Sequence, residues 1–177
     1  MQYEFKIALS FATEEQELVN KVYHYLKAEN VQAFFAPSAE GQTVLSGKNQ
    51  REIFYSIFGL KSEYVALFVS KNYIAREVPM EEASIAFSKH SNDGTVIPIY
   101  LDETVLPIDM LDPKKINYFK SNDPIAIANH LATKIKQTSS TYKDAYIPVE
   151  PKGIMNNKNN TAEKQIFIQQ LDGSINL

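Results

Sequence analysis

The chain has 177 residues, no cysteine and a formal net charge of -3, with 18 Lys and Arg against 21 Asp and Glu. This length suits one domain with a remainder, and the absence of cysteine excludes disulfides, thiolate metal ligands and a cysteine nucleophile. The acidic balance argues against binding to nucleic acid, which needs a basic surface. With no signal peptide and no apolar run of about 18 residues, we expect a cytoplasmic protein that does not enter the membrane.

The N-terminal segment predicts a strand followed by a helix. Apolar side chains alternate along residues 5–11, which is typical of a strand that is buried on much of both faces. We expect a helix to begin at Thr13, because Thr13 and Gln16 have the spacing of a capping box. Its apolar residues recur at helical spacing, and Asn30 is expected to end it.

The next stretch predicts a strand, a loop and a second helix. Residues 31–36 are expected to form a strand that ends before a proline, and residues 38–48, which contain two glycines, are expected to form a loop. Residues 51–58 carry apolar side chains at helical spacing, and we expect Gly59 to end that helix.

The middle of the chain predicts the centre of a sheet. Residues 64–69 form the most apolar segment and are expected to be the central strand. Pro79 suits the first position of a helix over 79–89. A fourth strand is expected over 96–101, where Pro98 favours an irregular or edge-like position because proline has no backbone N–H.

The last ordered elements complete an alternating pattern. Residues 116–119 predict a short fifth strand, and residues 124–136 predict an amphipathic helix. Strands that alternate with helices predict an α/β domain over 1–136, with a five-stranded parallel sheet in the middle of three layers. Ligands of such sheets bind at the carboxyl ends of the strands.

The C-terminal part has a different composition. Residues 137–164 are rich in Ser, Thr and Asn and are expected to form a linker. Two apolar-alternating runs flank Asp172 and Gly173 and predict a short β-hairpin over 165–177. Because an isolated hairpin is marginal in water, we expect it to dock on the domain, pair with another copy or bind a partner protein.

Five local strings carry a family resemblance: residues 5–11, 12–19, 45–48, 70–73 with Val78 and Glu82, and 101–104 with Pro107. In this order they resemble the Toll/interleukin-1 receptor (TIR) domain over about residues 1–136, which implies a flavodoxin-like fold. The chain departs from the family at three positions. Lys6 replaces an acid, and Ser46 and Val78 stand where bacterial members often have tryptophan.

The resemblance implies an activity. Many bacterial and plant TIR domains cleave NAD+, so the chain is expected to be an NAD+ glycohydrolase or cyclase that releases nicotinamide and ADP-ribose or a cyclic variant, with NAD+ as substrate and no cofactor. The resemblance also implies self-association through the TIR domain and a role in bacterial antiphage immunity. The alternative is a noncatalytic module that only binds other TIR domains, which Lys6 and the missing tryptophans favour.

Glu82 is the expected catalytic acid, because it follows Val78 at the family's Trp-x-x-x-Glu spacing. A carboxylate near the ribose can stabilise the positive charge that develops as nicotinamide leaves. The helix dipole alone also favours an acid in the first turn, and a shift of the alignment by one residue would give the role to Glu81.

The carboxyl ends of the first two strands and the following loop supply the expected substrate contacts. Backbone amides at the start of the first helix would bind phosphates. The alternative is that they belong to an ordinary capped helix with no ligand. The end of the second strand would form a wall for adenine or nicotinamide, or pack in the core, and the loop lysine would meet a phosphate or lie in solvent. These residues are Ser10, Phe11, Ala12, Thr13, Phe35, Ala36, Pro37, Gly47 and Lys48. The three histidines are isolated, which predicts no metal site.

Overall fold

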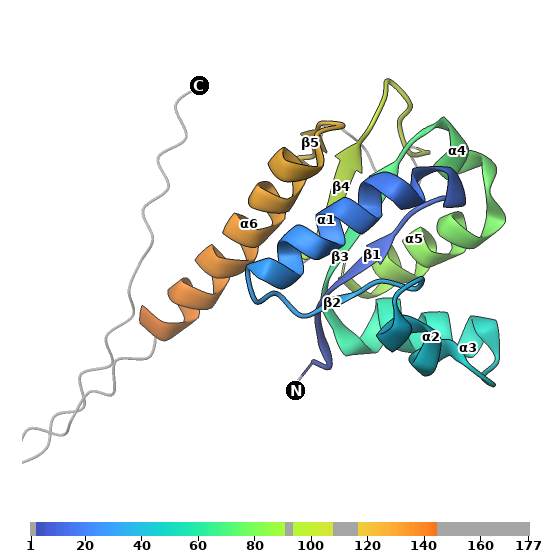
Figure 1. The fold of residues 1–177 in the computed structure, drawn as a ribbon, viewed down its shortest axis with the longest axis horizontal. Coiled ribbons are helices and arrows are strands. Elements are labelled where there is room, and N and C mark those ends of the chain that lie inside the picture. The colour runs from blue at the N-terminus through green and yellow to red at the C-terminus, as the bar shows by residue number, and fades with distance from the viewer. Residues whose placement is uncertain (1–2, 91–93, 108–116, 145–177) are drawn as a thin grey trace, which may run out of the picture. The chain divides into compact units, whose positions relative to one another are not determined.

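The computed structural model describes residues 3–90, 94–107 and 117–144 of the chain. Their five strands form one parallel sheet in the order β2-β1-β3-β4-β5 (Figure 1). The strands are β1 (Phe5–Ser10), β2 (Ala33–Phe34), β3 (Ser62–Val69), β4 (Val96–Tyr100) and β5 (Phe119–Lys120). The expected five-stranded parallel sheet and the central place of its third strand are confirmed.

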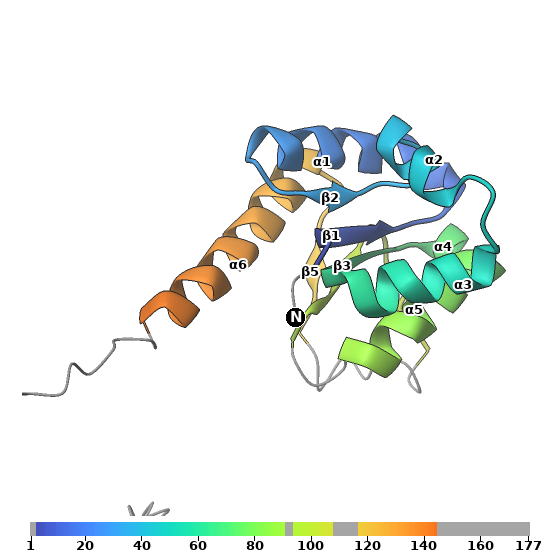
Figure 2. The same ribbon diagram turned by 90° about the horizontal axis from the view of Figure 1, so that it is seen from below.

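Helical segments cover both faces of this sheet (Figure 2). They are the 3-10 turn η1 (Thr13–Glu15), α1 (Gln16–Ala28), α2 (Ala39–Leu45), α3 (Gln50–Phe54), the π-helical turn η2 (Tyr55–Lys61), α4 (Lys71–Ala75), α5 (Glu77–His90) and α6 (Pro124–Asp144). α1 and α6 pack on one face, and α3, η2 and α5 pack on the other. The three-layer arrangement is therefore as predicted.

The alternation of side chains along β3 explains the two layers of core. Tyr64, Ala66 and Phe68 belong to the cluster beneath α1 and α6, whereas Val65 and Leu67 belong to the cluster beneath α3 and α5. Successive side chains of a strand point to opposite faces. An uninterrupted apolar segment is therefore what a strand buried on both faces requires.

The start of α1 differs from the prediction. The expected capping box at Thr13 and Gln16 is wrong, because the chain enters the helix through η1 and no side chain caps either element. Glu15, at the N-cap of α1, instead accepts hydrogen bonds from Ser70 Oγ at 2.7 Å and Asn72 Nδ2 at 3.0 Å. The predicted end at Asn30 is confirmed, since Asn30 has the left-handed φ of 60°.

The segment after β2 was expected to be a loop but contains α2. The Ser38 side chain caps this helix by accepting from Gly41 N at 2.9 Å. Gly41 is pressed against the backbone, because a Cβ there would lie 2.3 Å from the Phe35 carbonyl oxygen. The carbonyls of Phe35 and Ala36 accept from Ser38 N and Gln42 Nε2, which ends β2 two residues earlier than predicted.

Three helical segments are longer than predicted. Gly59 does not end its helix, because η2 continues to Lys61 and packs its glycine against Ile85 and Lys89 of α5. α5 begins at Glu77, before Pro79, and the short α4 precedes it. α6 continues to Asp144, beyond the predicted end at 136.

Pro98 occupies the outer side of β4. Tyr100 O accepts from Ser121 N beside β5, and Leu101 N donates to Val69 O beside β3. Since strand residues alternate between their two neighbours, Pro98 faces the β5 side, where the paired residues of β4 are Ile99 and Tyr100. On its β5 side, β4 is therefore unpaired by the described residues from Val96 to Pro98, which agrees with the edge-like position expected from the proline.

The remainder of the predicted linker and the whole predicted hairpin at 165–177 lie outside the described residues. The boundaries 1–136, 137–164 and 165–177 remain predictions. Within the described segments, no helix combines the length and apolar character that crossing a membrane requires.

Candidate active site

The strand order places a ligand crevice between β1 and β3. The chain order reverses direction there, and in open parallel sheets a crevice forms at the carboxyl ends of the strands beside such a reversal. β1 ends at Ser10 and β3 is followed by Ser70, so both hydroxyl groups lie at this edge. α5 contributes a carboxyl group to the same place.

Glu82 of α5 is buried, with 8% of its surface exposed. Ser10 Oγ lies 2.6 Å from Glu82 Oε2 and donates to it when the carboxyl group is ionised. The same Oγ lies 2.7 Å from the hydroxyl oxygen of Tyr73, which in turn donates to the Pro79 carbonyl at 2.9 Å. A buried chain of polar groups thus joins the end of β1 to α4 and α5.

Burial controls the charge of this acid. Loss of solvation raises the pKa of Glu82 from 4.5 to about 8, the hydrogen bond from Ser10 opposes the rise, and the neighbouring charge of Glu81 adds to it. Burial also raises the pKa of the Tyr73 phenol well above its usual range, so this residue keeps its hydrogen. At neutral pH a pKa of about 8 favours the protonated form of this carboxyl group.

Glu81 and Glu82 have different surroundings. The Glu81 side chain is 30% exposed, and its Oε1 accepts from Arg51 Nε of α3 at 2.7 Å. Neighbouring helical residues diverge by about 100°, which explains why one carboxylate meets Ser10 while the other meets a surface guanidinium. Of the two acids considered from the sequence, Glu82 is the one at the carboxyl edge of β1.

A smaller hollow of about 560 Å³ opens beside this chain of polar groups. An ion pair between Glu14 and Arg76 links η1 to the segment between α4 and α5 at its rim. Arg76 is the only cationic residue among those that line the hollow, which are Phe11, Thr13, Glu14, Arg76, Glu77, Val78 and Pro79. Glu82 does not line this hollow, although Pro79, three residues earlier on α5, does.

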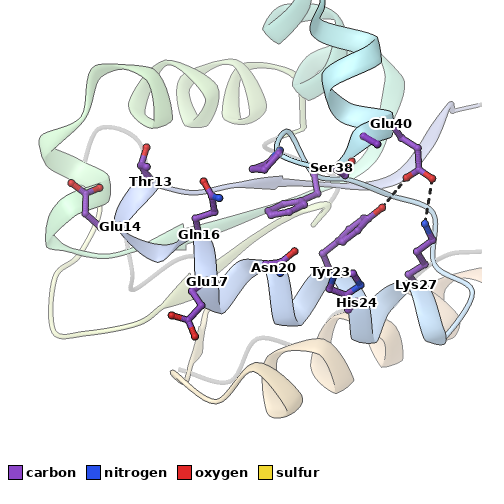
Figure 3. A pocket seen from close by; sticks show the side chains of 13 residues that line it. Thr13, Glu14, Gln16, Glu17, Asn20, Tyr23, His24, Lys27, Ser38 and Glu40 are labelled. Atoms are coloured by element: carbon purple, nitrogen blue, oxygen red, sulfur yellow. Dashed lines mark hydrogen bonds and ion pairs between the residues drawn. The ribbon is translucent and has the colours of Figure 1, made fainter.

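A larger hollow of about 790 Å³ lies between α1 and the start of α2 (Figure 3). On one side of it, Glu40 accepts from the Tyr23 hydroxyl at 2.8 Å and from Lys27 Nζ at 3.2 Å. Thr13 and Glu14 line both hollows, so both border η1. The side chains that line the larger hollow are Thr13, Glu14, Gln16, Glu17, Asn20, Tyr23, His24, Lys27, Phe35, Pro37, Ser38, Ala39 and Glu40.

The structure brings part of the predicted substrate-binding set together. Ser10 contacts the catalytic candidate directly, and the rings of Phe11 and Phe35 stack with centroids 5.4 Å apart. Thr13 and Pro37 line the larger hollow with Phe35. Ala12 is buried, with its carbonyl accepting from Glu15 N, and Ala36 is half-buried at the turn into α2.

Gly47 and Lys48 lie apart from this group. They follow α2, they are exposed, and they are absent from the linings of the two hollows. Sequence reasoning missed the contribution of Tyr73, Glu14 and Arg76. The string 70–73 contains this tyrosine, but nothing in the sequence indicates that its hydroxyl group reaches β1.

The described parts of the chain hold no cluster of three or more His, Asp or Glu side chains that could bind a metal ion. The polar groups that the structure brings together at this edge are the buried carboxyl group of Glu82 and the hydroxyl groups of Ser10 and Tyr73. Such a carboxyl group can stabilise a developing positive charge once it has lost its proton.

Comparison with known proteins identifies the fold family. A sequence model described as the TIR domain matches residues 7–134. The chain belongs to the TIR domain family. The TIR domain of the Toll-related receptor TRR-2 from Hydra magnipapillata has the same fold, with a TM-score of 0.59 and 15% identity over 75% of this chain and 98% of that one. The resemblance inferred from the five strings is confirmed.

One relative of this TIR protein is a named enzyme. It is the 3' cyclic ADP-D-ribose synthase AaTIR from Aquimarina amphilecti, 28% identical over 152 residues. The match covers 81% of this chain but 44% of the relative, so the chain spans less than half of that protein's length.

Proposed function

We propose that this TIR domain cleaves the bond between nicotinamide and ribose in NAD+, with Glu82 as the catalytic carboxylate. The observation that carries the proposal is the buried carboxyl group of Glu82 at the β1/β3 crevice, which is hydrogen-bonded to Ser10 at the end of β1. It lies four residues after Val78, which is the family spacing inferred from the sequence. The relative named as a cyclic ADP-ribose synthase supports the same substrate.

The main requirement of the proposed reaction is a group that stabilises the positive charge on the ribose. When the bond breaks, its electron pair stays with the pyridinium nitrogen, so nicotinamide leaves as a neutral molecule and needs no general acid. The ribose carbon becomes a cation, which an ionised Glu82 would stabilise. Water then adds and loses a proton to give ADP-ribose, or a hydroxyl group of the same nucleotide adds and loses a proton to give a cyclic product.

Ionisation of Glu82 is coupled to substrate binding in this scheme. The pKa of about 8 leaves the resting carboxyl group protonated at neutral pH. A pyridinium ring beside it brings a positive charge into a buried site, and a nearby opposite charge lowers the pKa of an acid. NAD+ itself would thus favour the ionised form that its cleavage needs.

The hollows beside η1 are the proposed place for the rest of the substrate. The backbone amides of residues 11–13 and the guanidinium of Arg76 would contact the phosphates, once Arg76 is released from Glu14. Phe35, Ala36 and Pro37 would form a wall for one ring. Gly47 and Lys48 are the weakest members of the predicted set, since they do not line either hollow.

Glu82 must become more accessible before a ribose can reach it. It does not line either of the two hollows, although Val78 and Pro79 of its own helix line the smaller one. We propose that association with a second TIR domain opens and completes the site, and that the reaction serves bacterial antiphage immunity. The same burial favours the alternative, a TIR module that binds other TIR domains without catalysis.

Nicotinamide release from NAD+ tests the proposal. The wild-type chain is assayed at high protein concentration, with and without a crowding agent that promotes assembly, beside Glu82→Ala and the matched surface variant Glu81→Ala. We expect release by wild type and by Glu81→Ala, and none by Glu82→Ala. Release that persists in Glu82→Ala would contradict the assigned role, and no release by the assembled wild type would favour the noncatalytic alternative.

A further inference from the structure

The chain of polar groups at Glu82 contains three short contacts, but its two hydroxyl groups together carry only two hydrogen atoms. Glu82 Oε2 and Ser10 Oγ lie 2.6 Å apart, and Ser10 Oγ and the Tyr73 hydroxyl oxygen lie 2.7 Å apart. The Tyr73 hydroxyl group also lies 2.9 Å from the Pro79 carbonyl oxygen. Each of these three contacts needs its own hydrogen atom.

Counting hydrogens separates the two charge states of Glu82. When the carboxyl group is ionised, Ser10 and Tyr73 supply one hydrogen each, so one of the three contacts has none. When it is protonated, Glu82 donates to Ser10, Ser10 donates to Tyr73, and Tyr73 donates to the Pro79 carbonyl. Only the protonated form satisfies the whole chain.

We propose that Tyr73 is a positioning residue for Glu82, which acts through the Ser10 hydroxyl group to hold the resting carboxyl group in its protonated form. The proposal rests on the proposed function in treating Glu82 as the catalytic group. Tyr73 is fully buried, and a bond from its backbone N to Ser70 Oγ fixes its place in the first turn of α4. Its hydroxyl group therefore has fixed partners, with no access to solvent.

The surroundings of Glu82 contain few other groups that would compete for this role. Arg51 of α3 is bonded to Glu81, and Glu15 of η1 is bonded to Ser70 and Asn72. On α5 itself the other charged or titratable side chains are Glu77, Glu81, Lys89 and His90. On the elements that contact α5 they are Lys71 and Tyr73 on α4, Tyr55 and Lys61 on η2, Lys6 on β1 and Tyr100 on β4. Of these, Tyr73 is hydrogen-bonded to Ser10, whose hydroxyl group contacts Glu82.

Tyr64 offers a matched control for the loss of a tyrosine hydroxyl group. It is 1% exposed, lies on β3 in the core cluster beneath α1 and α6, and its hydroxyl group has no hydrogen-bond partner among the described residues. Tyr73 belongs to the cluster on the opposite face of the sheet. Both Tyr73→Phe and Tyr64→Phe therefore remove a buried hydroxyl group. Only the hydroxyl group of Tyr73 is hydrogen-bonded to Ser10.

Titration of the Glu82 carboxyl group tests the inference without reference to activity. Carboxyl carbons of glutamate are labelled with carbon-13 in the full chain, and the resonance of Glu82 is assigned by its loss in Glu82→Gln. In Tyr73→Phe, Ser10 is free to donate to the ionised carboxylate, so we expect the pKa of Glu82 to fall by about one pH unit, the worth of one hydrogen bond. In Ser10→Ala the carboxylate loses its donor, so the pKa should rise, and in Tyr64→Phe it should stay unchanged.

The outcomes are distinct. An unchanged or raised pKa in Tyr73→Phe, or an equal fall in Tyr64→Phe, would overturn the inference. If wild type releases nicotinamide, the rise of its rate with pH should move to lower pH in Tyr73→Phe by the same amount as the titration, whereas a merely structural loss would lower the rate at every pH. Failure of the wild type to cleave NAD+ would contradict the proposed function and leave the titration as a separate test of the hydrogen-bond chain.

Discussion

The buried carboxyl group of Glu82 should make the fold less stable as the pH rises. The pKa of this group is raised from 4.5 to about 8 in the folded chain, chiefly by burial. Folding therefore favours the protonated form, so the contribution to stability is fully present below pH 4.5 and is lost as the pH rises through 8. Replacing the group with an amide, which stays neutral and can donate to Ser10, should remove this dependence.

The size of the effect follows from the same two pKa values. At about 1.36 kcal/mol for each pH unit, a rise from 4.5 to about 8 corresponds to about 5 kcal/mol at most. This is a large part of the stability of a typical domain. The free energy of unfolding of Glu82→Gln should therefore approach that of wild type near pH 4.5 and exceed it by several kcal/mol, up to about 5, at pH 9.

Urea unfolding at pH 5, 7 and 9 measures this difference. Glu81→Gln is the control, because its side chain is 30% exposed and pairs with Arg51 at the surface, where an ion pair contributes about 1 kcal/mol or less. The expected result is a gap between wild type and Glu82→Gln that widens with pH, with no such trend for Glu81→Gln. A gap of the same size at pH 5 and pH 9 would refute the reasoning that burial sets the charge of Glu82.

Three further predictions follow from the described structure. Nicotinamide release by wild type at NAD+ concentrations well below saturation should rise with pH through about 8, because the proposed reaction needs ionised Glu82 and the rate then follows the free protein, and a rate that is flat between pH 6 and 9 under this condition would contradict this. Gly41→Ala should destabilise the fold by about 3 kcal/mol in urea unfolding, since its Cβ would lie 2.3 Å from the Phe35 carbonyl oxygen. Asn30→Gly should stabilise it by about 0.5 kcal/mol, because Asn30 has a φ of 60° that glycine adopts without strain, and a loss of stability there would be the contrary result.

The parts of the fold that the sequence predicts are those whose signal is local. β1, β3 and β4 are predicted because each must bury side chains on the faces of a sheet, which leaves alternating or continuous apolar residues along the strand. The parts that it misses depend on contacts between distant segments. α2 forms where Gly41 can approach the backbone of Phe35 and Ala36, just after β2, and a glycine in a polar stretch is equally typical of a loop.

The candidate site divides in the same way. Glu82 is found from its spacing to Val78, but spacing alone leaves Glu81 as an alternative, and only the partners Ser10 and Arg51 tell the two acids apart. Tyr73 is 63 residues from Ser10 in the chain, so no local pattern connects them. The capping box at Thr13 fails for a related reason, because the first turn of α1 exchanges its local bonds for bonds to α4.

These contacts bear on how a TIR domain could keep such a site inactive until it is needed. A protonated Glu82 cannot stabilise a ribosyl cation, and the cost of ionising it is set by burial and by the bonds to Ser10 and Tyr73. If Glu82 is the catalytic group, any event that solvates this end of α5 or brings a positive charge to it lowers that cost and activates the site. Substrate and a neighbouring TIR domain would then act on the same quantity, the pKa of Glu82. The two should therefore be cooperative, so NAD+ should promote assembly to the same extent that assembly strengthens NAD+ binding.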